Sequence, residues 1–145
     1  MGSLTRNLSA VATYSHLKMR DSLGRRVRGV ADDIAAVLLN YRFADGGLEG
    51  LSLSFGVNYS GSRAGDIPIN FTPLGEVGKV SFFLEPYYAT TLGASCRWKD
   101  KYHFRLIVDN VLDDKDFIVV AGGRVSGTGI TTQPGTNIRL STTVE

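Results

Sequence analysis

The sequence predicts an all-β chain, specifically a segment of an antiparallel, up-and-down transmembrane β-barrel with about six long strands. Between Leu51 and Arg63, apolar residues alternate with polar or small ones, which is the period of a strand with one apolar face. This run of 13 residues is longer than the ordinary strand of about five or six residues. Its length instead matches the roughly 9–11 residues that a tilted transmembrane strand needs. We therefore expect lipid, rather than a packed core, to meet the apolar face.

Two further strands are predicted before this run. In the first, Leu8–Arg20, every second residue from Leu8 to Tyr14 is apolar, and Ser9, Thr13 and Ser15 take the opposite face. In the second, Asp33–Phe43, apolar residues alternate with Asn40 and Arg42 on the other face. A helix over 33–43 is an open alternative, because Asp33 could cap it and apolar residues also recur there at helical spacing. The neighbouring strands favour a strand.

Three more strands follow it, each with one apolar and one polar face. They are Tyr88–Trp98, Tyr102–Val111 and Asn137–Glu145.

The connections between these strands alternate in length. Residues 21–32, 64–87 and 112–136 form long connections, whereas 44–50 and 99–101 are short. Outer-membrane barrels have long external loops and short periplasmic turns, so the rhythm supports the barrel. Aromatic residues also gather at the predicted strand ends, as in the interfacial girdles of such barrels. They are Tyr41, Phe43, Trp98 and Tyr102 beside the short turns, and Tyr59 and Tyr88 beside the long connections.

The composition narrows the possible functions. The 16 basic and 14 acidic residues nearly balance, so no nucleic-acid partner is expected. The single cysteine, Cys96, excludes an internal disulfide and a multi-cysteine metal site. The first residues contain no apolar signal-peptide core, so either the chain is intracellular or its targeting signal lies upstream of Met1.

We expect no catalytic, metal-binding or cofactor site. His16 and His103 fall on different predicted strands, and no G-x-S-x-G motif is present. The glycine-rich segment Gly122–Gly129 lacks the lysine and hydroxyl residue of a phosphate loop, which favours an external loop. The acidic group at Asp113, Asp114 and Asp116 lacks calcium-loop spacing, which favours a role in ending a strand and starting a turn.

The arginines fall into two groups. Arg25, Arg26 and Arg28 lie in the first long connection, where they could pair with lipopolysaccharide phosphates or simply be solvated. The second group shares the polar strand faces, and in a barrel it would point to the lumen, where it could attract an anionic group. Its members are Arg42, Arg63, Arg97, Arg105 and Arg139.

Three segments of the chain, in order, resemble the TonB-dependent outer-membrane receptors, their siderophore branch in particular. The segment NYRFADGGLEGLSLSFGVNYSGSRAGD (Asn40–Asp66) resembles a strand–turn–strand stretch of that family. FRLIVDNVLDDKDF (Phe104–Phe117) resembles its penultimate strand, although Asp109 and Phe117 depart from the usual Asn and Tyr. NIRLSTTVE (Asn137–Glu145) resembles the last strand, which normally ends in an aromatic residue, so we expect Phe or Trp after Glu145.

The resemblance implies that residues 1–145 are the C-terminal part of a plugged barrel of about 22 strands, without its plug domain. It implies no enzyme activity, but active uptake of a ferric siderophore or similar scarce chelate across the outer membrane of a Gram-negative-type bacterium. The implied partners are the chelate, the TonB complex acting through the missing N-terminal plug, and outer-membrane lipid and lipopolysaccharide. The candidate ligand contacts are Arg63, Phe71, Phe82, Phe83, Tyr87 and Arg124.

Two alternatives remain open on the sequence. A small soluble β-sandwich or barrel that binds a ligand or partner would turn the same apolar residues inward, so that Leu51, Phe55, Val57, Leu92 and Leu106 face one another. A passive porin would share the strands, and only the upstream sequence would distinguish it from a gated receptor.

Overall fold

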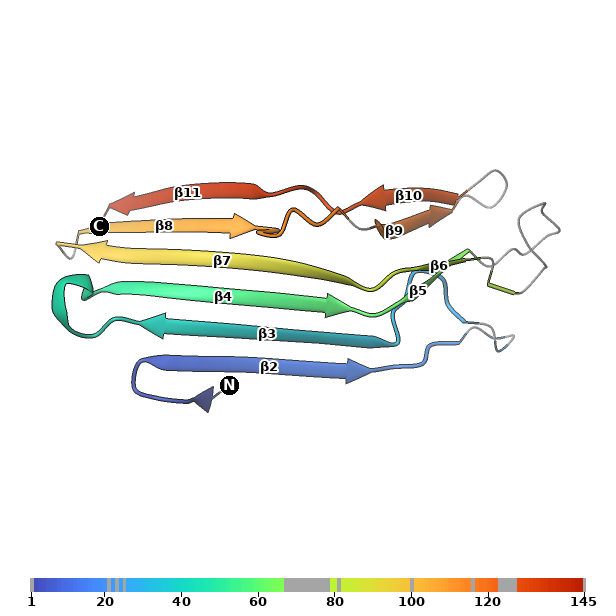
Figure 1. Ribbon diagram of the computed structural model, residues 1–145, viewed down its shortest axis with the longest axis horizontal. Coiled ribbons are helices and arrows are strands. Elements are labelled where there is room, and N and C mark those ends of the chain that lie inside the picture. Colours follow the sequence, from blue (N-terminus) through green and yellow to red (C-terminus); the bar gives the residue numbers. More distant parts are fainter. Residues whose placement is uncertain are drawn as a thin grey trace.

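The chain forms one long antiparallel sheet in the computed structural model, which describes residues 2–20, 22, 24, 26–66, 79–80, 82–99, 101–115, 117–122 and 128–144. The strand order is β1-β2-β3-β4-β7-β8-β11, and the long strands lie side by side in Figure 1. The strands of this sheet are β1 Gly2–Ser3, β2 Leu8–His16, β3 Asp33–Arg42, β4 Leu51–Ser60, β7 Tyr87–Trp98, β8 Tyr102–Asp109 and β11 Asn137–Val144.

Short and long connections lie at opposite ends of the sheet (Figure 1). A tight turn joins β7 to β8, with Trp98 paired to Tyr102 and Lys99 in the left-handed region at φ 53°. A short 3-10 helix, η1 (Gly46–Leu48), lies between β3 and β4, and Gly50 leaves that turn at φ 84°, where a side chain would be strained. The predicted alternation of short turns and long connections is confirmed.

The strand register brings the predicted apolar faces onto one side of the sheet. Residues directly opposite each other in an antiparallel pair share a face. One row across five strands therefore runs Tyr41, Leu53, Ala94, Leu106 and Leu140. The next row runs Leu39, Phe55, Leu92, Val108 and Ile138.

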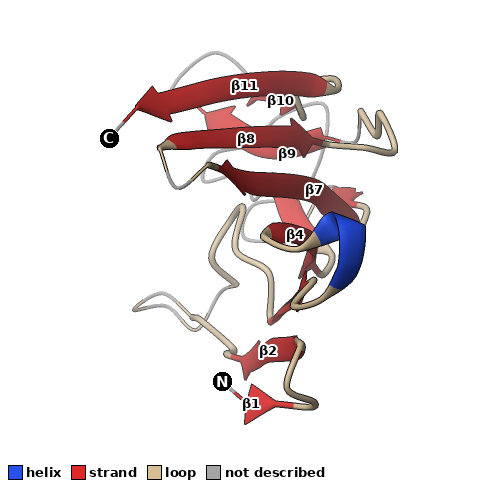
Figure 2. Cartoon of the chain, turned by 90° about the vertical axis from the view of Figure 1, so that its left-hand side faces the viewer, coloured by secondary structure: helices blue, strands red, loops and turns tan. Residues whose placement is uncertain are grey.

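No second layer covers this apolar face in the described part of the chain, as the end-on view in Figure 2 shows. The side chains of Phe55, Leu92 and Leu106 are 41%, 42% and 39% exposed, and Leu140 is 73% exposed. In a sandwich these residues would pack against the second sheet. The soluble-sandwich alternative is therefore wrong for this sheet, and the predicted fold class is confirmed.

Aromatic pairs mark both ends of the apolar face. Tyr59 and Tyr88 lie 5.1 Å apart between ring centroids near the long connections, and Trp98 and Tyr102 lie 5.6 Å apart at the opposite end. Ten residues separate Tyr88 from Trp98 along β7, about 33 Å at ~3.3 Å per residue. A tilt of about 40° reduces this to roughly 25 Å, the height of the apolar band in outer-membrane barrels.

The differences from the prediction lie at strand ends and in the long connections. Residues 33–42 form a strand, so the helix alternative is wrong. The first and third strands end at His16 and Ser60, earlier than predicted. Four short strands in the long connections were not predicted: β5 Arg63–Asp66 pairs with β6 Phe82–Leu84, and β9 Phe117–Gly122 with β10 Thr128–Thr132. No helix in the described part of the chain could span a membrane.

Candidate functional site

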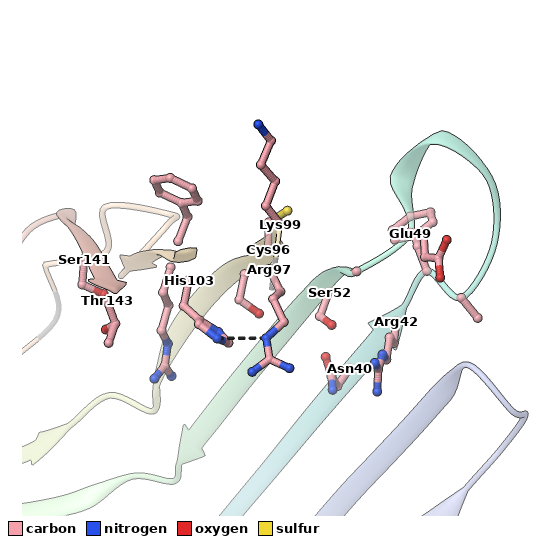
Figure 3. A pocket seen from close by; sticks show the side chains of 16 residues that line it. Asn40, Arg42, Glu49, Ser52, Cys96, Arg97, Lys99, His103, Ser141 and Thr143 are labelled. Atoms are coloured by element: carbon pink, nitrogen blue, oxygen red, sulfur yellow. Dashed lines mark hydrogen bonds between the residues drawn. The ribbon is translucent and has the colours of Figure 1, made fainter. Parts of the chain in front are cut away.

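A basic hollow of about 960 Å³ lies on the polar face of the sheet, at the end of the short turns. Figure 3 shows Arg42, Ser52, Arg97 and His103 pointing to this side, whereas Lys99 points to the opposite side. Arg105 also lines the hollow, and Glu49 is the only acidic residue among the described residues that line it. The hollow therefore presents positive charge above a floor of small side chains.

The sheet register explains how distant parts of the sequence supply this charge. Arg42 and Arg105 lie in one row across the sheet, separated by the small side chains of Ser52 and Ser95. Three strand spacings of about 4.8 Å place the two arginine backbones roughly 14 Å apart. Arg97 lies in the adjacent row, opposite His103. An anionic group of a partner or ligand could therefore fit between the arginines, above the serines.

Hydrogen bonds order part of this face. Arg97 Nε donates to His103 Nε2 at 2.9 Å, so that ring nitrogen is unprotonated in this arrangement. Arg139, the predicted lumenal arginine on β11, instead binds Asp109, with 2.6 Å between Nη2 and Oδ2. Arg42, Arg97 and Arg105 are thus brought together as the sequence indicated, whereas Arg139 is neutralised by its neighbour.

The predicted ligand contacts that can be placed lie at the opposite end of the sheet. Arg63, on β5, is only 3% exposed; its Nη2 donates to the Glu85 carbonyl at 3.2 Å, and its guanidinium lies 4.6 Å from the Tyr87 ring centre. Phe83 is 51% exposed. Phe82 and Tyr87 are half-buried, whereas Phe71 and Arg124 lie outside the described residues.

After β8, Asp113 of the acidic group joins the two ends of the third long connection through its side chain. Asp113 Oδ1 accepts the N–H of Thr136 at 3.1 Å, and Lys115 lies 3.3 Å from the other carboxylate oxygen. These two interactions, the backbone hydrogen bond first, hold the pKa of Asp113 below its ordinary value. Asn110, 6% exposed, donates to the carbonyls of Asp114 and Pro134 at 2.7 Å each. Of the three predicted acidic residues, Asp113 has the turn-forming role that the sequence predicted. Asp116 lies outside the described residues.

The two histidines belong to separate polar clusters. His16 Nδ1 lies 2.7 Å from Asp33 Oδ1, which also accepts the hydroxyl of Tyr14 at 2.6 Å. His103 is paired with Arg97 in the basic hollow. In the described part of the chain, no three histidine, cysteine or acidic side chains are placed to hold a metal ion.

The chain is similar in structure to outer-membrane siderophore receptors. It matches the ferripyoverdine receptor FpvA of the outer membrane of Pseudomonas aeruginosa, solved with ferripyoverdine and in complex with pyocin S2, at TM-score 0.76 and 25% identity. It matches the ferric-catecholate import receptor Fiu of Escherichia coli K12 in fold, at TM-score 0.71 and 18% identity. No protein-family model and no curated protein sequence matches the chain.

These matches cover nearly the whole of this chain but a small part of each receptor. Each covers 97% of the chain, which spans 17–19% of the receptors' length. The neighbours are receptors rather than enzymes, and they agree with the predicted location in the outer membrane. The resemblance drawn from the sequence is thereby confirmed: this chain has the fold of a segment of the TonB-dependent siderophore receptors.

Proposed function

We propose that this chain is the C-terminal barrel wall of a TonB-dependent receptor that takes up a ferric siderophore or a similar scarce chelate. One observation carries the proposal: six strands in continuous register place all the predicted apolar rows on one exposed face and the arginines on the other. The similarity to FpvA over 97% of the chain supports the same assignment. The remaining strands and the plug would be supplied by the rest of the receptor.

In this proposal the two ends of the sheet have different tasks. The long connections, which carry Phe83 and Tyr87, face the outside and contact the chelate. The basic hollow at the short-turn end faces the lumen, where Arg42, Arg97 and Arg105 attract plug carboxylates or an anionic chelate. Energy for release would come from the TonB complex acting on the plug, so this chain performs no covalent chemistry.

The proposal is tested by placing an arginine on each face of β4 in the complete receptor. Leu53→Arg puts the charge on the apolar face, where near the membrane midplane it costs about 2–4 kcal/mol. We expect loss of outer-membrane assembly and of growth on the ferric chelate as sole iron source. Asn58→Arg is the matched control, because Asn58 lies on the polar face of the same strand and is exposed.

The two variants together distinguish the outcomes. If Asn58→Arg assembles in the outer membrane and Leu53→Arg does not, the result supports a lipid-facing apolar surface. Equal tolerance of both arginines contradicts it. If Asn58→Arg assembles and Leu53→Arg does not, but the wild-type receptor supports growth on no ferric chelate, the uptake proposal is wrong even though the apolar face meets lipid.

A further inference from the structure

The apolar side chains that are fully buried in the described part of the chain lie outside the long sheet. Ala31, Ala64 and Leu84 are 5%, 0% and 4% exposed. Ala31 belongs to the first long connection, whereas Ala64 and Leu84 belong to β5 and β6 in the second. A small packed centre therefore forms where these two connections leave the sheet.

Backbone contacts join the two connections at this centre. The N–H of Gly29 donates to the carbonyl of Ala64 at 2.9 Å. Ala31 forms an isolated antiparallel bridge with Arg63. The first connection thus runs beside β5 as an irregular additional strand, although 32 residues separate Ala31 from Arg63.

Arg26 links both connections through its side chain. Its Nη2 lies 2.9 Å from Asp32 Oδ2, within the first connection. The same nitrogen donates to the carbonyl of Ser62 at 3.4 Å, and the guanidinium lies 5.5 Å from the ring centre of Phe83. With one-fifth of its side chain exposed, Arg26 contacts the protein rather than bulk solvent. Free solvation therefore does not describe Arg26, whereas pairing with lipopolysaccharide stays a prediction.

Arg63 holds the two ends of the second connection together. Its contacts with the Glu85 carbonyl and the Tyr87 ring tie β5 to the segment that leads from β6 into β7. Gly65 packs equally closely, because a Cβ at that position would overlap the ring of Phe82. Both ends of the second connection are thus held against the same centre.

We propose that residues 26–32, 61–66 and 82–87 form one rigid loop platform, in which Arg26 and Arg63 are positioning residues and the exposed ring of Phe83 is presented to the ligand. The ligand part of this inference rests on the proposed function. The mechanical part does not, because it concerns contacts within the chain. A substitution that destabilises either connection should then also reduce the protection of backbone amides in the other.

Amide hydrogen exchange in the complete receptor tests the coupling in both directions. Arg26→Ala, in the first connection, should raise exchange about tenfold at residues 63–66 and 82–84 of the second, a typical effect for side chains in direct contact. Gly65→Ala, in the second connection, should raise exchange at residues 27–31 of the first. Arg26→Lys should restore part of the protection, because it keeps the charge beside Asp32.

Arg20→Ala is the matched control, since Arg20 lies in the same connection with its side chain exposed. Exchange that rises only in the connection carrying each substitution would overturn the platform. Ferric-chelate binding by the same variants separates the two proposals. If exchange rises in both connections and the variants bind the ferric chelate more weakly, the platform and its ligand role are both supported. If exchange rises in both connections but the wild-type receptor binds no ferric chelate, the platform stands and the uptake function is overturned.

Discussion

At the scale of single residues, a few polar side chains close the bases of the long connections. Asn110 has φ 49° and Asp113 has φ 51°, so both occupy the left-handed region that asparagine and aspartate tolerate best among side-chain-bearing residues. Asn110 also accepts the N–H of Asp114 at 3.1 Å through its side-chain oxygen. Side chains therefore hold the turn after β8 together with two backbone hydrogen bonds, from the N–H of Asp113 to the Asn110 carbonyl and from the N–H of Val111 to the Thr90 carbonyl of β7.

The lowered pKa of Asp113 makes this closure sensitive to acid. A carboxylate with a depressed pKa stabilises the folded state above its ordinary pKa of about 3.9, and this stabilisation is lost as pH falls through the depressed value. We expect the Thr136 amide to lose protection below about pH 4, after correction for intrinsic exchange. Asp113→Asn should weaken protection at neutral pH and remove the acid dependence. An unchanged acid dependence in the asparagine variant would show that another group controls the turn.

The residues of the basic hollow could be predicted, whereas those of the loop platform could not. Arg42, Arg97 and Arg105 alternate with apolar neighbours, so the period of two assigns their face, and the antiparallel register of neighbouring strands brings them to the same end of the sheet. Arg26 carries no such signal, and the alternation that assigned Arg63 to the polar strand faces is misleading, because β4 ends at Ser60 and Arg63 lies buried in β5. Their positions depend on how two connections fold back on each other, which no local pattern in the sequence encodes.

At the scale of elements, the long sheet has two open edges within the described part of the chain. β11 pairs with β8 on one side only, and all eight of its residues are exposed. β2 is covered on its outer side only by the two-residue strand β1. Unpaired edges of this length recruit other chains unless a barrel closes over them.

The isolated chain should therefore aggregate. Expressed alone, residues 1–145 should enter inclusion bodies, because an apolar face and two open edges are exposed together. Size-exclusion chromatography coupled to light scattering, in buffer without detergent, checks this. A soluble, monodisperse monomer would contradict both the open edges and the lipid-facing surface.

The long strands were predicted well because each alternates over many residues, but their ends depend on partners. β4 ends at Ser60 although the alternation continues to Arg63, since its ladder with β3 ends where Ser60 pairs with Ile34. β2 ends at His16, opposite Asp33, for the same reason. The hairpins β5–β6 and β9–β10 are short and irregular, each with a register shift, so periodicity does not reveal them.

At the scale of the whole molecule, the sheet inverts the usual arrangement of a globular domain. The large apolar side chains form exposed rows, and the polar side chains surround a basic hollow on the other face. Such a surface is stable only where hydrocarbon replaces water on the apolar side. Aromatic pairs roughly 25 Å apart at the two ends match the thickness of that hydrocarbon layer.

Site-directed spin labelling along β4 tests this arrangement most directly. With Cys96 replaced by serine, single cysteines at residues 51–60 of the proposed complete receptor in lipid vesicles would each carry a nitroxide. We expect odd positions, including Leu53, Phe55 and Val57, to be accessible to oxygen dissolved in the lipid, and even positions to a water-soluble nickel reagent. Loss of this alternation, or water access at the odd positions, would contradict a lipid-facing sheet.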